Sequence, residues 1–173
     1  MTLHIVIDGY NLIRQSPRLK HLDHQDIQRG RQTLLDELAL YKKGKRHRIT
    51  VVFDGANAPV FTQPQDRIKG IDILFSRAGE SADTIIKRIS AREKEKALIV
   101  TSDREIVVFA MSQGAAVISS LHFGEKIARS DPAPDDSSGY LDVKSWNPST
   151  KKKGPSRRLS KRERKNKIKT SKL

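Results

Sequence analysis

The chain of 173 residues contains no cysteine and no long run of apolar residues. Without cysteine it can form no disulfide scaffold, no Cys-ligated zinc or iron–sulfur site and no thiol nucleophile. Because no stretch reaches the ~18 apolar residues of a membrane span, we expect no transmembrane helix. The first eight residues lack the basic segment and small-residue cleavage site of a signal peptide. These absences predict a cytoplasmic protein in a reducing compartment. The length of 173 residues fits one domain with an appendage.

Three common nucleotide-binding and hydrolase motifs are missing as well. The sequence has no GxxxxGKS or GxxxxGKT, no GxGxxG after its first apolar run and no GxSxG. These gaps argue against a P-loop nucleotidase, a dinucleotide-binding domain and a serine hydrolase of the elbow type.

Positive charge is in excess and lies mostly at the C-terminal end. The chain has 34 Lys and Arg against 20 Asp and Glu, a net charge of +14. Residues 151–173 hold 12 of these cations and one acidic residue, which leaves a net charge of +3 for residues 1–150. The excess predicts a polyanionic partner, either nucleic acid or an anionic membrane, with an acidic substrate surface as a weaker alternative.

With few apolar residues to bury, residues 151–173 are expected to be a disordered tail when free. We expect this tail to bind RNA or ribosomal phosphates without sequence specificity. The tail cations that we assign to RNA binding are Lys151, Lys152, Lys153, Arg157 and Arg158.

Residues 130–150 are rich in Asp, Pro, Ser and Gly and are interpreted as a linker. They contain the only tryptophan, Trp146. The segment from Tyr140 to Trp146 either docks onto the domain or a partner, or stays exposed. The folded domain is therefore expected within residues 1–129.

Residues 1–129 alternate between strand and helix patterns. Short apolar runs predict strands at residues 3–7, 49–53, 71–75, 97–100 and 115–118, and helical spacing predicts helices at residues 25–42, 83–95 and 105–113. Ser102-Asp103-Arg104-Glu105 fits a capping box before the last of these helices. Apolar strands separated by helices predict a three-layer α/β fold around a mainly parallel sheet of about five strands.

Acidic residues follow these strands. Asp8, Asp54 and Asp103 come directly after strand runs or within three residues of them, and Glu80 and Asp83 lie at the start of a predicted helix. Because the carboxyl ends of parallel strands share one edge, we expect these carboxylates to converge there. Clustered carboxylates repel one another and are matched by a hard divalent cation such as Mg²⁺. A metal next to basic segments indicates phosphodiester hydrolysis by an activated water.

Each of these polar residues also has a structural interpretation. Asp83 and Asp103 could cap a helix or complement its dipole, and Asp-Gly pairs are common in turns. Asn11 could orient Asp8, supply an oxygen ligand, or cap its loop. Ser102 is expected to cap the following helix, and it or Thr101 could hold a metal-bound water.

A second basic cluster precedes the strand run at residues 49–53. Its residues could form a solvated loop or, with other basic residues of the domain, a rim that binds phosphates. The cations assigned to RNA binding here are Arg14, Lys42, Lys43, Lys45, Arg46 and Arg48.

Four motifs, at residues 4–13, 51–55, 79–86 and 100–103, together resemble the YacP-like NYN domain of the PIN-like nuclease superfamily. The resemblance covers roughly residues 3–129. It implies a parallel α/β sheet, an acidic pocket for Mg²⁺ or Mn²⁺, and endoribonuclease activity, in some relatives on messenger RNA at the ribosome. By this resemblance the catalytic and metal-binding set is Asp8, Glu80, Asp83 and Asp103, with Asn11 supporting. Asp54 matches an acidic position of some PIN-like branches, or else shapes the loop after it.

The leading hypothesis is a divalent-metal-dependent endoribonuclease that uses water as its nucleophile. The alternative is a non-catalytic RNA- or ribosome-binding protein with a PIN-like platform for the tail. The four acidic positions argue against this alternative, because a pure RNA binder has no use for a negative pocket. A flap-cleaving DNA nuclease ranks lower, since no helical arch or duplex-binding module is evident.

Overall fold

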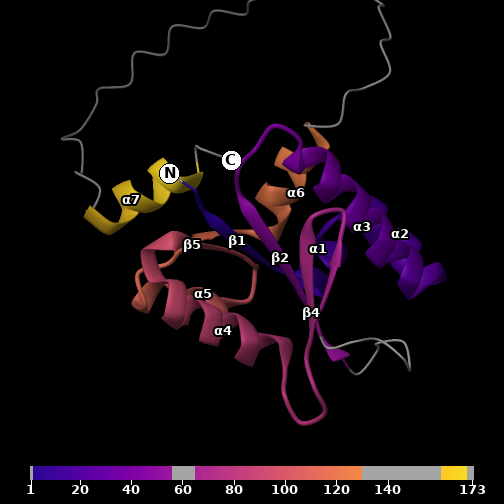
Figure 1. Ribbon diagram of the computed structural model, residues 1–173, viewed down its shortest axis with the longest axis horizontal. Coiled ribbons are helices and arrows are strands. Elements are labelled where there is room, and N and C mark those ends of the chain that lie inside the picture. The colour runs from indigo at the N-terminus through magenta and orange to yellow at the C-terminus, as the bar shows by residue number, and fades with distance from the viewer. Residues whose placement is uncertain (1, 56–64, 130–160, 171–173) are drawn as a thin grey trace, which may run out of the picture.

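A computed structural model describes residues 2–55, 65–129 and 161–170. In these residues one sheet lies between two layers of helices (Figure 1). The strand order is β3-β4-β2-β1-β5-β6. The strands are β1 (His4–Asp8), β2 (Arg48–Phe53), β3 (Gln65–Ile68), β4 (Ile71–Phe75), β5 (Ala97–Val100) and β6 (Ala116–Ile118).

The sheet is parallel except at one edge. β1 pairs in parallel with β2 and β5, β2 with β4, and β5 with β6. All residues of β1 and β5 are buried, as expected for central strands covered on both faces. The three-layer α/β fold and its five apolar strands are confirmed. The sixth strand, β3, runs antiparallel to β4 and was missed because its sequence, QDRI, is polar.

Two helical layers cover the sheet. One contains α1 (Gly9–Gln15), α2 (Pro17–Gln25), α3 (Ile27–Lys42) and α6 (Ser120–Ala128), and the other contains α4 (Ala82–Glu93) and α5 (Arg104–Ser112). A 3-10 turn, η2 (Lys94–Lys96), leads into β5. The predicted helices correspond to α3, to α4 with η2, and to α5. Buried side chains on each face, such as Phe123 on one and Ile86 on the other, form two core clusters separated by the sheet.

Residues 161–170 form a helix, α7 (Lys161–Thr170), which packs beside β6. The Asn166 side chain accepts a hydrogen bond from the Val117 N–H at 2.8 Å and donates one to the Val117 carbonyl at 3.1 Å. The expected disorder of the tail is therefore wrong for these residues, because α7 occupies a strand edge that would otherwise expose unpaired backbone groups.

Several predicted features lie outside the described residues. They are the linker with its Tyr140–Trp146 segment and the tail cations Lys151, Lys152, Lys153, Arg157 and Arg158. Among the helices that the structure does describe, none has the length and apolar character needed to cross a membrane.

Candidate active site at the carboxyl edge of the sheet

Asp8 ends β1 and begins the site. It is 9% exposed, and its Oδ1 accepts a hydrogen bond from the Asn11 backbone N–H at 3.2 Å, which makes Asp8 the N-cap of α1. Its Oδ2 accepts from the Thr101 hydroxyl at 3.2 Å. Burial raises the pKa of Asp8, these two bonds oppose that rise, and the charges of Asp83 and Asp103 add to it. Asp8 is thus a buried carboxylate held by two donors and repelled by two other acids.

The two Asp-Gly pairs after β1 and β2 allow close packing and do not form hairpin turns. A Cβ atom on Gly9 would lie 2.3 Å from the Phe53 ring. A Cβ atom on Gly55 would lie 1.9 Å from the Ser76 carbonyl oxygen. Glycine therefore lets the backbone after Asp8 and Asp54 lie close to Phe53 and Ser76 without a side-chain clash.

Asp103 is tied to Asp8 through Thr101. The Asp103 N–H donates to the Thr101 hydroxyl oxygen at 3.1 Å, and the same hydroxyl donates to Asp8. Asp103 Oδ1 accepts from the N–H groups of Glu105 and Ile106 at 2.8 and 3.2 Å, so Asp103 is the N-cap of α5. Asp103 therefore caps α5 and is at the same time linked to Asp8, so its role as a helix cap is compatible with a role in the site.

The prediction that Ser102 caps α5 is wrong, because Asp103 occupies that position. The Ser102 hydroxyl instead accepts from the Ser120 N–H at 3.2 Å, at the start of α6. Glu105, expected as the capping-box partner, forms an ion pair with Lys87. Ser102 supports the site by joining the loop after β5 to α6.

Asp83 lies in the first turn of α4, and Ser81 is the N-cap of that helix. Burial raises the pKa of Asp83, and the charges of Asp103, Glu105 and Asp54 raise it further, against an opposing effect of Lys87. Asp83 is therefore not the helix cap, and it interacts electrostatically with carboxylates from two strand ends. This effect also connects Asp54 to the site.

Asn11 acts through its side chain on other parts of the loop cluster. Its Oδ1 accepts from the Ser102 N–H at 2.9 Å and from the Ser120 hydroxyl at 2.7 Å. Its backbone, not its side chain, contacts Asp8. Asn11 thus joins α1, the loop after β5 and α6.

Glu80 is the member of the predicted set that the structure places apart. It lies in the loop before α4, and its Oε1 pairs with Arg88 Nη2 at 2.9 Å. Arg88 is 64% exposed, so this is a surface ion pair of small energetic value.

Lys87 was missed by the sequence analysis. It lies four residues after Asp83, one helical turn along α4, and its Nζ pairs with Glu105 on α5. Its charge lowers the pKa of Asp83. The i, i+4 spacing from Asp83 was the available signal, and Lys87 is the cation that balances part of the negative charge here.

The acids of this edge have the donor chemistry of a hard divalent cation, namely carboxylate oxygens. Within residues 2–55, 65–129 and 161–170, no three His, Asp or Glu side chains are gathered closely enough to hold a metal ion. The electrostatic effects of these acids on one another show instead a shared negative potential from Asp8, Asp83 and Asp103, to which Asp54 contributes.

The basic residues assigned to RNA binding divide between the two ends of the sheet. Arg14 lies on α1, and its guanidinium is 5.9 Å from the centre of the Tyr10 ring. Lys42, Lys45, Arg46 and Arg48 line a cavity at the amino ends of the strands, and Lys43 is exposed beside them. Most of this cluster is therefore remote from the carboxylates.

Comparison with known proteins gives consistent matches. The model of the YacP-like NYN domain family matches residues 5–171, well beyond the expected residues 3–129. Uncharacterized protein YacP of Bacillus subtilis (strain 168) is 28% identical over 86 residues, which are 50% of this chain and 50% of YacP. The aligned part thus spans about half the length of that relative.

Two crystal structures of Rae1 (YacP) from Bacillus subtilis are similar to this chain. One has a TM-score of 0.59 and 28% identity, covering 75% of this chain and 76% of that chain. The other, of a single-residue variant, has a TM-score of 0.58 and 27% identity, covering 75% and 78%.

Proposed function

The chain belongs to the YacP-like NYN domain family, which has a PIN-like nuclease fold consistent with RNA nuclease activity, and we propose that it is a divalent-metal-dependent endoribonuclease. One observation carries the proposal. Asp8, Asp83 and Asp103 come from separate elements, yet the charges of Asp83 and Asp103 raise the pKa of Asp8. Mutual repulsion of this kind costs stability unless a cation or a proton neutralises it.

The residues proposed to hold Mg²⁺ or Mn²⁺ are Asp8, Glu80, Asp83 and Asp103, with Glu80 released from Arg88. A bound metal of this kind lowers the pKa of a coordinated water and stabilises charge on phosphodiester oxygens. Thr101 and Asn11 serve as positioning residues, since their hydrogen bonds join the strand ends that carry the acids. The cations proposed to contact RNA phosphates are Lys87, whose charge acts on Asp83, and Arg14, which lies on the helix that begins after Asp8.

The proposed substrate is RNA, and the specific form is messenger RNA on the ribosome. The net charge of +14 supports a polyanionic substrate. The alternative is a non-catalytic RNA- or ribosome-binding protein, which would bind RNA without producing new RNA ends.

The experiment incubates the full chain with polysomes and, in parallel, with naked RNA, in Mn²⁺ or Mg²⁺ and in EDTA, and maps new RNA ends. The test variant is Asp83→Asn. Asp36→Asn is the matched control, because Asp36 is a surface carboxylate on α3 that pairs with Lys69.

New ends that need metal and Asp83, but not Asp36, are the expected result. Their presence on polysomes alone would identify the ribosome-associated form as the substrate. If no new ends form on either substrate while salt-sensitive RNA binding persists, the nuclease proposal fails and the non-catalytic alternative stands.

A further inference from the structure

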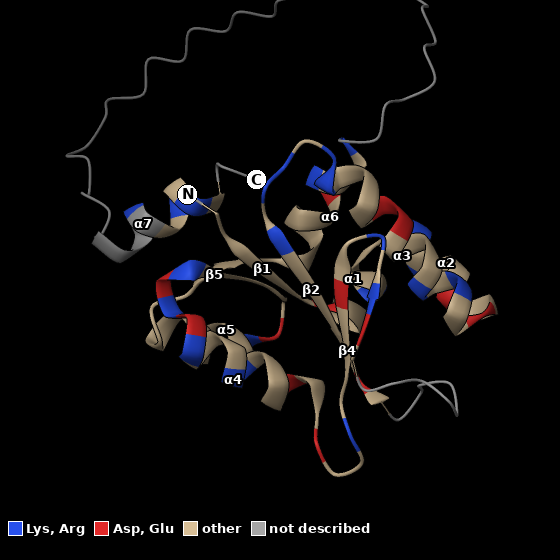
Figure 2. Ribbon diagram, viewed as in Figure 1, with Lys and Arg blue, Asp and Glu red and all other residues tan. Residues whose placement is uncertain are grey.

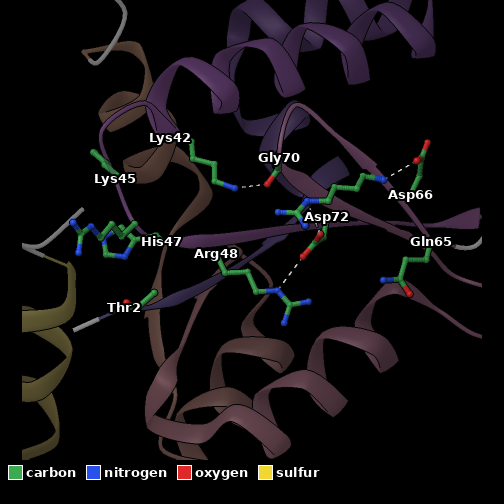
Figure 3. A pocket seen from close by; sticks show the side chains of 11 residues that line it. Thr2, Lys42, Lys45, His47, Arg48, Gln65, Asp66, Gly70 and Asp72 are labelled. Carbon is green, nitrogen blue, oxygen red and sulfur yellow. Dashed lines mark hydrogen bonds and ion pairs between the residues drawn. The ribbon is translucent and has the colours of Figure 1, made fainter.

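A hollow lined by basic side chains lies at the amino ends of the strands. Figure 3 shows the side chains that line it, and its volume is about 940 Å³. We call it the basic groove; its charged lining comprises Lys42, Lys45, Arg46, Arg48 and Arg67, with Asp66 and Asp72. Five cations against two carboxylates give it a positive potential, so a polyanion is the ligand class that it fits.

Asp72 holds two arginines side by side in the groove. Its Oδ2 accepts from Arg48 Nε at 2.9 Å, and its Oδ1 lies 3.6 Å from Arg67 Nε. The two arginine side chains are still 56% and 70% exposed. Exposed ion pairs contribute little energy, and guanidinium groups bind phosphate oxygens through two parallel hydrogen bonds. The pair is thus oriented by Asp72 and remains available to phosphates.

The other side of the groove comes from the chain between α3 and β2. Lys42 Nζ donates to the Gly70 carbonyl, and Lys45 Nζ lies 3.5 Å from the centre of the Tyr41 ring. Arg46 is exposed and has no hydrogen bond or ion pair with any other residue that the structure describes. Cations on two facing walls match the repeated phosphates of a nucleic acid strand better than a single anion.

The groove and the acidic edge are at opposite ends of the same strands. His4 pairs with Arg48 in register, and Asp8 pairs with Val52. The four intervening steps along β1 correspond to about 13 Å at ~3.3 Å per residue. RNA phosphates in the groove are therefore too far from Asp8 to be the cleaved ones.

Helix α7 brings further positive charge to the same end. Lys169 Nζ donates to the carbonyl of Glu95, in the turn that directly precedes β5. In Figure 2, Lys and Arg mark both α7 and the loop that leads into β2, near the labelled chain ends. The amino edge thus collects cations from three separate segments of the chain.

We propose that the basic groove binds the sugar–phosphate backbone of RNA as an anchor remote from the acidic edge. This inference rests on the proposed function and narrows its substrate class. The substrate is an RNA long or folded enough to contact both ends of the sheet at once.

The test measures RNA binding by fluorescence anisotropy in EDTA, where cleavage cannot occur, across a range of salt concentrations. The probe is a single-stranded RNA of ~30 nucleotides, well above the ~4–16 nucleotides that one OB-fold domain covers. The groove variant is Arg46→Gln with Arg67→Gln. The control is Arg18→Gln with Lys20→Gln on α2, which removes the same charge elsewhere.

The groove variant should bind the RNA about tenfold more weakly, and its plot of log affinity against log salt should be shallower by ~1.4, the value for two lost phosphate contacts. The control should change both quantities much less. Equal losses in the two variants would overturn the anchor, as would unchanged RNA binding by the groove variant. The binding measurement does not depend on cleavage. If the groove effect is seen but no new RNA ends form in the separate cleavage assay with Mn²⁺ or Mg²⁺, the nuclease is refuted and the anchor is retained.

Discussion

The hydroxyl of Thr101 is a single group on which the geometry of the acidic edge depends, and Thr101→Val removes it while keeping the shape of the side chain. Thr101 is completely buried. In the variant, Asp8 Oδ2 loses a donor and the Asp103 N–H loses an acceptor. A hydrogen bond to a charged group is worth about 1.5–3 kcal/mol, so we expect a loss of that order in the free energy of unfolding at neutral pH.

The loss should depend on pH because the lost donor acts on ionised Asp8. The pKa of Asp8 is already raised, so the stability contributed by this carboxyl is fully present below its unfolded pKa and is lost as pH rises through the folded pKa. The Thr101 bond reduces that loss by favouring the ionised form. Thr101→Val should therefore differ least from the original protein at acidic pH and most at neutral pH.

Thermal unfolding followed by circular dichroism at several pH values tests this. For a domain of this size, the expected stability loss lowers the Tm by roughly 5–10 °C at neutral pH. Thr101→Ser is the control, since it keeps the hydroxyl and should show a small decrease that does not vary with pH. An unchanged Tm for Thr101→Val at neutral pH, or one equal decrease at every pH, would refute the assigned hydrogen bond.

Three further substitutions test other parts of the structure. Asp103→Asn should abolish metal-dependent RNA cleavage and keep the fold, since Asn caps helices as well as Asp; wild-type cleavage would remove Asp103 from the catalytic set. Asn166→Ala should cost about 1–3 kcal/mol and speed hydrogen exchange at the Val117 amide; unchanged exchange would contradict the docking of α7. Gly9→Ala should lower the free energy of unfolding by about 1–3 kcal/mol through overlap with Phe53, and equal denaturation midpoints would disprove that contact.

Five strands could be predicted because each contains several apolar residues in close succession. All residues of β1, β5 and β6 are buried and only Arg48 of β2 is exposed, whereas β4 combines buried and partly buried residues and contains Asp72. Strand β3 has no such run, because it lies at the edge of the sheet and its residues are mostly exposed. It forms a strand because its backbone pairs with β4, and the hydrophobic pattern of the sequence QDRI gives no sign of that pairing.

Helix α7 and the cap of α5 were missed for different reasons. The α7 sequence, KRERKNKIKT, has too few apolar residues to predict docking. The helix is held by polar contacts, from Asn166 to the backbone of Val117 and from Lys169 to the carbonyl of Glu95. At α5, Ser102 and Asp103 are both good capping residues and are adjacent. The cap is Asp103, and the Ser102 N–H and hydroxyl are engaged by Asn11 and Ser120.

Cations gather at the amino edge of the sheet and carboxylates at its carboxyl edge because of where these residues lie relative to the strands in the sequence. In a parallel sheet, residues before each strand lie at one edge and residues after it lie at the other. Cations precede β2 in residues 42–48 and flank β5 on its amino side at η2, whereas Asp8 and Asp54 follow β1 and β2. A glycine after each of these two acids avoids a clash with Phe53 or with Ser76 at this edge. At β2 the order of charge is basic before the strand and acidic after it, which places cations at one edge of the sheet and a carboxylate at the other, as the proposed RNA anchor requires.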